Sequence, residues 1–406
     1  MHLVFRHSFY RVITASRLLN SIGSYLYNLV FVIYATTLPE ANWAVFLANM
    51  TAIVPTIFTF WVGVKADETR QKAKWMINLG WVQAGLFTLI AVMIGNKTFL
   101  VFSVVCILNF LSDLISDYIA GLRLPIMQYN LAKEDLFEAY SFAQFSTYLA
   151  NILGQGLGIY LLTLSDNNFT FVAFINAMSF ALSSLLLWRN KEKLTHQTVI
   201  SNSKKQSLFQ QFGEMYKQME DIFRKHSTSN FAYLLLSILI LNALGGSVSS
   251  IYHFYFMEHT LFNLTYGESL LVMEFILLLG AIIGSLTPHD FFSKQEFSFI
   301  LQFNASLFIV IGLLNVLGLA IWLGFPFLFG AAYLMGKLTP KLDALMMEHL
   351  PSETLAQSDH FIGLLFTLSL PIGTFFFSTL AVYSSALTWI CFSLAAVVIF
   401  FFSFKK

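Results

Sequence analysis

Charged side chains stand inside long apolar stretches at only a few positions of this chain. Arg17, Asp113, Asp117 and Glu274 are the clearest cases. One cation beside two carboxylates leaves one acid without a counter-charge, and such an acid can bind and release a proton. We therefore expect Arg17 to pair with Asp113 or Asp117, either within a proton-exchange site or as an ion pair that only fixes helix packing. Glu274 is expected to be a second protonation site or a partner for a cationic ligand.

Uncharged polar residues follow helical spacing in the same stretches. Those that would share a helix face with a charged residue, or line the wall of a polar cavity, are Ser21, Ser24, Tyr25, Asn28, Asn109, Gln144, Tyr148, Asn151, Asn242, Ser249 and His253. Side chains at i, i+4, i+7 and i+8 lie on one side of a helix. We expect His253 to be a hydrogen-bonded wall residue, with a protonation switch as the alternative.

The elements that hold these residues must be membrane helices. The chain has 406 residues, of which 57% are hydrophobic and 11% charged. Soluble domains carry about 25% charged residues, so this composition excludes a large soluble enzyme, a nucleic-acid binder and a disordered scaffold. It is enough for about ten to twelve bilayer crossings. Cys106 and Cys391 lie far apart in apolar stretches, and we expect both to be packing residues rather than disulfide or metal ligands.

Ten apolar segments are long enough to cross a bilayer, and they cover residues 18–39, 41–64, 75–96, 99–122, 139–165, 167–188, 230–257, 266–286, 297–336 and 360–404. The last two are 40 and 45 residues long. Because about 20 residues suffice for one crossing, each of these two must form a helical hairpin. The sequence therefore predicts an all-α membrane protein with twelve transmembrane helices.

The basic residues predict the orientation. With an even number of spans both termini share one side, and a cytoplasmic N-terminus leaves only Lys97 of the 23 Lys and Arg residues outside. Cytoplasmic loops carry an excess of Lys and Arg, so both termini are expected in the cytoplasm.

The chain is expected to consist of two six-helix halves, residues 1–188 and 230–406, joined by a cytoplasmic linker over residues 189–229. Apolar residues at helical spacing over residues 208–223 predict an amphipathic helix in the linker. A displacement of 219 positions superposes Glu134 on Glu353 and Gly154 on Gly373, together with several apolar pairs. This parallel repeat is a known plan of transporters, in which the substrate binds between the halves near the middle of the membrane.

The loop between the second and third spans carries a family resemblance. In residues 63–72, Gly63, Asp67 and Lys72 match the loop signature of the major facilitator superfamily, while Arg70 departs from it. The chain resembles this superfamily, which implies its fold of two six-helix halves. Carried over to this sequence, the resemblance implies that the loop, with Gly63, Asp67, Arg70 and Lys72, is a conformational latch. The alternative is a solvated basic loop.

Three further stretches are similar to the bacterial macrolide-efflux branch of drug exporters: residues 131–136, 255–259 and 369–373. The resemblance implies proton-coupled export of a hydrophobic or amphipathic small molecule from the bacterial plasma membrane by one chain. The alternatives are export of a lipid or peptide-like product, import, a non-transporting receptor or immunity protein, and a membrane enzyme acting on lipid. No phosphate-binding loop of an ATP-driven pump occurs, and no cofactor, metal or nucleic-acid partner is expected.

Overall fold

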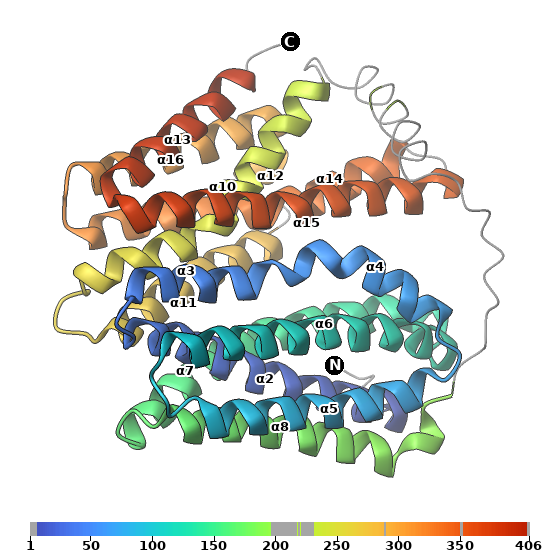
Figure 1. The fold of residues 1–406 in the computed structure, drawn as a ribbon. Coiled ribbons are helices and arrows are strands. Elements are labelled where there is room, and N and C mark those ends of the chain that lie inside the picture. The colour runs from blue at the N-terminus through green and yellow to red at the C-terminus, as the bar shows by residue number, and fades with distance from the viewer. Residues whose placement is uncertain are drawn as a thin grey trace. The chain divides into compact units, whose positions relative to one another are not determined.

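The computed structural model describes residues 6–195, 217, 220, 231–287, 290–349 and 352–403. All regular elements in this part of the chain are helices, which confirms the predicted fold class. The chain divides into two compact units, Met1–Asn202 and Ser203–Lys406, which run from blue to green and from yellow to red in Figure 1. The amphipathic helix predicted over residues 208–223 lies outside the described residues, apart from Lys217 and Glu220.

The first unit is built from long helices joined by short turns. Its helices are α2 (Ser8–Thr36), α3 (Ala41–Ile53), α4 (Pro55–Glu68), α5 (Lys72–Met93), α6 (Phe99–Asn130), α7 (Lys133–Leu164) and α8 (Phe169–Arg189), followed by the short η1 (Lys191–Lys193). The turn between α7 and α8 places Asp166 and Asn167 at φ 53° and 61°. Aspartate and asparagine tolerate this left-handed region better than other non-glycine residues, so the turn can be short.

The second unit repeats this plan. Its helices are α10 (Phe231–Glu258), α11 (Tyr266–Leu286), α12 (Phe291–Lys294), α13 (Phe297–Val316), η2 (Ile321–Gly324), α14 (Phe325–His349), α15 (Ser352–Tyr383) and α16 (Ser385–Phe402). Both predicted hairpins are confirmed, because residues 297–336 divide into α13 and α14 and residues 360–404 into α15 and α16.

Eleven helical segments of the described part are long and apolar enough to cross a membrane. They include every predicted span except α7, which is 32 residues long. Gln155 lowers the hydropathy of α7, and so does Asn151, which the sequence placed among the cavity-lining residues. The chain is thus a polytopic helical membrane protein.

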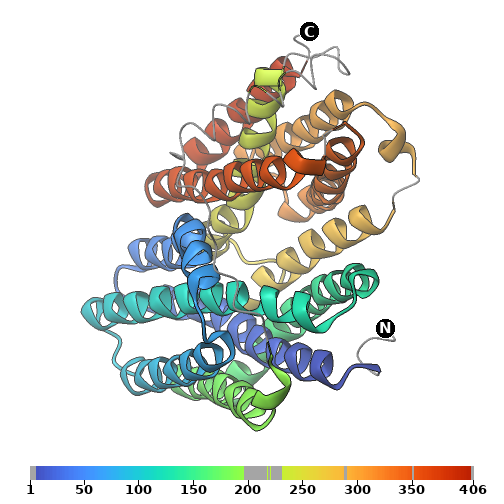
Figure 2. The same cartoon turned by 90° about the vertical axis from the view of Figure 1, so that its right-hand side faces the viewer.

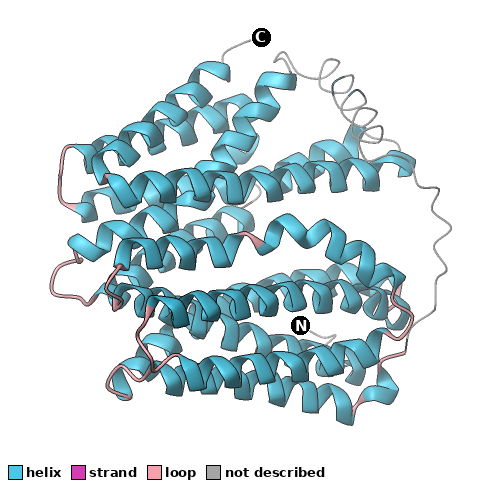
Figure 3. Ribbon diagram, in the orientation of Figure 1, coloured by secondary structure: helices cyan, strands magenta, loops and turns pink. Residues whose placement is uncertain are grey.

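The second predicted span is interrupted. α3 ends at Ile53 and α4 begins at Pro55, and Figure 3 shows the break as a short loop between two helices. Proline has no backbone N–H and clashes with the preceding turn, so the helical hydrogen bonds cannot continue through it. The Thr56 hydroxyl donates to the carbonyl of Ile53 at 2.6 Å and satisfies one acceptor at the break.

Equivalent helices pair in the same way in both units. In the first unit α2 packs on α7 and α8, and α5 packs on α8 and α6. In the second unit α10 packs on α15 and α16, and α13 packs on α16 and α14. Figures 1 and 2 both show α5 and α8 side by side. The predicted repeat of two six-helix halves is confirmed by this topology.

The two glycines that the repeat superposes occupy equivalent crossings. A Cβ at Gly154 of α7 would lie 2.8 Å from the carbonyl oxygen of Ile22 in α2. A Cβ at Gly373 of α15 would lie 2.3 Å from the carbonyl oxygen of Ala243 in α10. Small residues allow two membrane helices to approach this closely. The sequence repeat therefore reports the same close helix contact in each unit.

Candidate functional site

Arg17 does not form the predicted ion pair. Its Nη2 donates to the hydroxyl of Thr147 in α7 at 2.8 Å, and that hydroxyl donates in turn to the carbonyl of Ala143 at 3.0 Å. Among the described residues no ion pair joins Arg17 to Asp113 or Asp117. The guanidinium group of Arg17 therefore turns toward α7 and not toward the acids of α6.

The two aspartates of α6 lie one helical turn apart and are half-buried. The hydroxyl of Thr59 donates to Oδ2 of Asp117 at 3.0 Å, which links α6 to the part of α4 that follows the Pro55 break. Asn109, one turn before Asp113, is buried with 5% of its surface exposed. These residues share one side of α6, as their spacing of four predicted.

Gln83 of α5 makes polar contacts with α6 that the sequence analysis did not predict. Its amide donates to the carbonyl and hydroxyl of Ser112 at 3.0 and 3.2 Å and to the hydroxyl of Ser116 at 2.8 Å. Gln83 is fully buried, so it joins α5 to a second face of α6. A single glutamine in an apolar segment has no spacing partner in its own helix, and no sequence pattern marks it.

The predicted cavity-lining residues of α2 and α7 have mixed environments. Ser21, Ser24 and Tyr25 are half-buried, whereas Asn28 is exposed. In α7, Tyr148 and Asn151 are half-buried, and the amide of Gln155 donates to Oδ1 of Asn151 at 2.6 Å. The side chain of Gln144 lies outside the described part. Their role as cavity walls stays a prediction.

In the second unit the two acids of α11 have different surroundings. Glu268 belongs to a capping box: Thr265 caps the helix, and the backbone N–H of Thr265 donates to Oε2 of Glu268 at 2.8 Å. Glu274 is half-buried in the middle of α11. Glu268 thus has a local structural task, which leaves Glu274 as the acid available for a site.

The other predicted wall residues of α10 are half-buried as well. His253 accepts a hydrogen bond through its backbone carbonyl from the hydroxyl of Tyr266 at 3.0 Å, and Asn242 lies nearer the start of the same helix. This bond ties α10 to the first turn of α11.

Two basic residues, Lys65 and Lys72, make the contacts that stabilise the end of α4 and the loop to α5. Nζ of Lys72, a buried side chain, donates to the carbonyl of Ala66 at 2.6 Å, so a cation meets the negative end of α4. Lys65 and Glu68 form an exposed ion pair at 2.9 Å, and Glu68 raises the pKa of the Lys65 ammonium group.

The described contacts also tie this loop to α6, through a hydrogen bond between the hydroxyls of Thr69 and Tyr118. Gly63 is half-buried near the end of α4 and Arg70 is exposed, while the side chain of Asp67 lies outside the described part. The latch role carried over for this loop is therefore untested.

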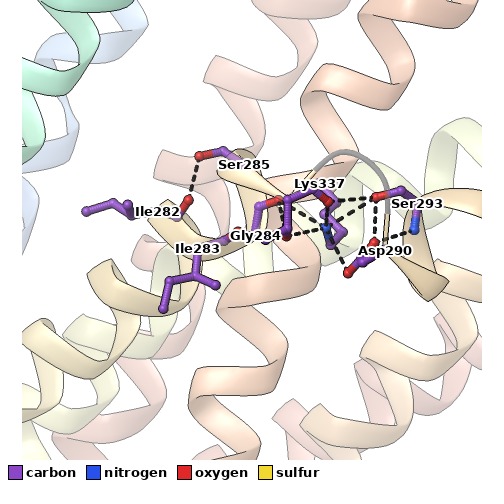
Figure 4. Close-up of polar contacts among 8 residues, drawn as sticks. Ile282, Ile283, Gly284, Ser285, Asp290, Ser293 and Lys337 are labelled. Carbon is purple, nitrogen blue, oxygen red and sulfur yellow. Dashed lines mark hydrogen bonds and ion pairs between the residues drawn. The ribbon is translucent and has the colours of Figure 1, made fainter.

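Lys337 performs the corresponding task in the second unit, and Figure 4 shows its contacts. Its Nζ donates to the carbonyls of Gly284 at 3.2 Å and Thr287 at 2.5 Å, and to the hydroxyls of Thr287 at 2.7 Å and Ser293 at 3.2 Å. It also forms an ion pair with Oδ2 of Asp290 at 3.1 Å. The Lys337 side chain of α14 therefore links the end of α11 to the start of α12.

The contacts around Lys337 also hold Asp290 in place and affect its ionisation. Its Oδ1 accepts from the backbone N–H of Ser293 at 2.9 Å and from the hydroxyl of Ser293 at 2.7 Å. Burial opposes ionisation of the carboxyl, but the Ser293 hydrogen bonds and the Lys337 ammonium outweigh it and lower the pKa of Asp290. Lys337 was counted in the sequence only as a basic residue at the cytoplasmic end of a span. The repeat offered a signal, since Lys337 lies 219 positions after Tyr118, the residue that ties the first loop to α6.

Arg123 of α6 is the second functional candidate that the sequence analysis missed. Its side chain has only 8% of its surface exposed, and its Nε has no hydrogen-bond partner in the described part of the chain. In the sequence Arg123 directly follows the predicted span over residues 99–122, where a basic residue at a cytoplasmic helix end is ordinary.

Comparisons with known proteins bear on the fold. No protein-family model and no curated protein matches the sequence. A crystal structure of a mutant of the nucleoside transporter NupG is 12% identical, with a TM-score of 0.72 over 98% of this chain and 100% of that chain. The POT family transporter PepTSo is 13% identical, with a TM-score of 0.68 over 97% and 96% of the two chains.

A bacterial homologue of the iron transporter ferroportin, in an inward-facing state, is 15% identical, with a TM-score of 0.67 over 98% of this chain and 99% of that chain. At these identities the likeness establishes the fold alone. The chain has the fold of the major facilitator transporters, as the loop signature implied.

Proposed function

We propose that this protein is a secondary active transporter that exports a hydrophobic or amphipathic small molecule by alternating access of its two six-helix units. The observation that carries the proposal is the repeated fold combined with isolated acids at membrane depth, Asp113 and Asp117 in the first unit and Glu274 in the second. Charged groups inside a membrane are costly and mark substrate or ion pathways. The printed names of the similar structures, which are transporters of nucleosides, peptides and iron, support a transport role.

Proton exchange is the proposed driving reaction. Asp113 has no ion-pair partner among the described residues, and Asp117 accepts a hydrogen bond from Thr59 without a counter-charge. An acid in this position can take up a proton on one side of the membrane and release it on the other. Glu274, half-buried in α11, offers the same chemistry in the second unit.

Flux measurements in proteoliposomes with an imposed pH gradient test the coupling. Wild-type protein should move a substrate faster with the gradient than without it, and Asp113→Asn and Asp117→Asn should lose this acceleration because an amide cannot release a proton. Asp166→Asn is the matched control, since Asp166 lies in an exposed turn whose backbone asparagine also tolerates. If both α6 variants keep a normal response to the gradient, these acids do not carry the proton.

A macrolide-like drug is the substrate that the sequence resemblance favours, and a lipid or peptide-like product, import, or a receptor without transport are the alternatives. A compound panel in the same proteoliposomes separates them. Substrate movement opposite to the proton gradient indicates export, movement with it indicates import, and binding without flux indicates a receptor. We further propose a single chain in the bacterial plasma membrane with both termini in the cytoplasm. Protease access to tags at the two termini in oriented vesicles tests this orientation.

A further inference from the structure

A small polar group lies inside the aromatic core at one end of the second unit. Tyr252 comes from α10, Asn315 from the last turn of α13 and Gly324 from η2, and α13 contacts both α10 and η2. Tyr252 is buried, with 0% of its surface exposed, and its ring centroid lies 5.6 Å from that of Phe256 and 5.2 Å from that of Trp389. A hydroxyl group in such surroundings needs hydrogen-bond partners.

Two hydrogen bonds fix the side-chain amide of Asn315. Its Nδ2 donates to the carbonyl of Ile311, one turn earlier in α13, at 2.8 Å and to the hydroxyl of Tyr252 at 3.3 Å. Because a backbone carbonyl can only accept, Nδ2 and not Oδ1 must face Ile311. Oδ1 is therefore the amide atom that is left over, and it is buried without a hydrogen-bond partner among the described residues.

The hydroxyl of Tyr252 is left with the opposite need. It accepts the hydrogen bond from Asn315, so its own hydrogen requires a separate acceptor, and the structure shows none for it among the described side chains and carbonyls. An open O–H donor and an open carbonyl acceptor thus lie beside the same hydrogen bond. Nε1 of Trp389, whose ring packs on Tyr252, is a further buried donor without a partner in the described part of the chain.

Gly324 leaves space next to this pair. The residue is buried, yet a Cβ placed on it would meet only the Tyr252 hydroxyl within 4 Å, at 3.9 Å, apart from its own turn and chain neighbours. Protein interiors are close-packed, so such room is unusual. A Cβ on Gly312 of α13, by contrast, would collide with the hydroxyl of Ser393. The helix ends that surround the space, residues 249–258, 311–324 and 385–392, are described without gaps.

We propose that one water molecule is bound between Tyr252, Asn315 and Gly324 as a fixed part of the second unit. It accepts a hydrogen bond from the Tyr252 hydroxyl and donates one to Oδ1 of Asn315. Water fits because it is small, both donates and accepts, and is held in protein interiors by roughly two to four polar partners. Such a bridge is nearly as favourable in enthalpy as a direct hydrogen bond, and it joins α10 to α13 beside η2, the turn that leads into α14.

Radiolytic hydroxyl-radical labelling of the purified full chain in phosphatidylcholine nanodiscs tests this site without requiring transport. The radicals form from water where it lies, so a buried ring is labelled when a water molecule is bound next to it. Labelling of Tyr252 in the wild type should exceed that of Tyr10 several-fold, each relative to its rate in the denatured chain. Tyr10 is the matched control, because it is 1% exposed and its hydroxyl already donates to the carbonyl of Ala139 at 2.9 Å.

Two variants remove the water in different ways. Gly324→Ala places a methyl group in the space, and it should fold because the nearest atom outside its own turn and chain neighbours lies 3.9 Å away. Asn315→Leu removes the acceptor. Labelling of Tyr252 should fall to the level of Tyr10 in both, whereas Gly156→Ala, which also has open space but lies in the first unit, should leave it unchanged. If one variant does not fold, the other decides.

Three results would overturn the proposal. The first is equal labelling of Tyr252 and Tyr10 in the wild type, which means that no water is bound at Tyr252. The second is unchanged labelling of Tyr252 in the folded variants. The third is strong labelling of Phe308, an apolar ring of the same unit with 1% of its surface exposed, because the core would then open to bulk solvent.

Discussion

Lys337 offers the sharpest test of the contacts in the second unit. Its side chain is buried, with 4% exposed, and it serves five acceptors from the end of α11, the following turn and α12. Lys337→Met keeps the length and apolar stem of the side chain and removes the ammonium group. The carbonyls of Gly284 and Thr287 and the carboxylate of Asp290 then lose their shared donor.

The expected cost follows from what is left unpaired. Breaking a fully buried ion pair costs about 3–5 kcal/mol. The side chain of Asp290 is 25% exposed, so water recovers part of this, and hydrogen bonds to a charged group contribute about 1.5–3 kcal/mol each when intact. We expect a loss of about 2–4 kcal/mol, concentrated in the loop between α11 and α13, because neighbouring contacts are not additive.

Thermal unfolding and hydrogen exchange measure the expected loss of stability, and a double-mutant cycle measures the Lys337–Asp290 coupling. Thermal unfolding of purified Lys337→Met should show a lower Tm than the wild type, and hydrogen exchange should rise over residues 284–297. Lys294→Met is the matched control, because Lys294 is exposed in the same loop. A double-mutant cycle with Asp290→Asn should give a coupling free energy of about 0.5–3 kcal/mol. A Tm and exchange pattern equal to those of the wild type would refute the assignment of Lys337 as the group that holds this loop.

Two further predictions rest on the same structure. The pKa of Asp290 is lower in the folded than in the unfolded protein, so its ionised form stabilises the fold above the unfolded pKa, near 4. This stabilisation is lost as pH falls through the lower folded pKa. The difference in Tm between wild type and Asp290→Asn should therefore shrink below about pH 4. Gly154→Ala or Gly373→Ala would press a Cβ against the backbone of α2 or α10 and should destabilise the protein by about 1–3 kcal/mol in thermal unfolding. Gly156→Ala is the control, because it has open space and should stabilise the protein by up to about 1 kcal/mol through helix propensity. A neutral result at both crowded glycines would contradict the close helix crossings.

The sequence predicts the architecture well because bilayer thickness constrains it. Apolar segments must be helical, and their lengths of 40 and 45 residues required two hairpins, both of which form. The break at Pro55 was not predicted, since the segment over residues 41–64 is free of charged residues and its length fits one helix. The orientation of the chain and the linker helix stay predictions.

The site was predicted less completely, because side-chain partners depend on tertiary packing. Spacing correctly placed Asp113 and Asp117 on one side of α6, but it paired Arg17 with them, whereas Arg17 bonds to Thr147. The acceptors of Lys337 include backbone carbonyls, which every residue carries, so no residue type marks them. The repeat of 219 positions relates Tyr118 to Lys337, but it shows the correspondence only once the Tyr118 contact is known from the structure.

Lys337 and Arg123 show why partners, rather than burial, indicate function here. Both are cations within long helices, and 4% and 8% of their surfaces are exposed. Lys337 has carbonyl, hydroxyl and carboxylate acceptors around it, so its charge is neutralised within the fold and serves structure. Nε of Arg123 has no hydrogen-bond partner among the described residues. Burial alone therefore does not separate the two cations, whereas the acceptors around Lys337 assign that side chain a structural role.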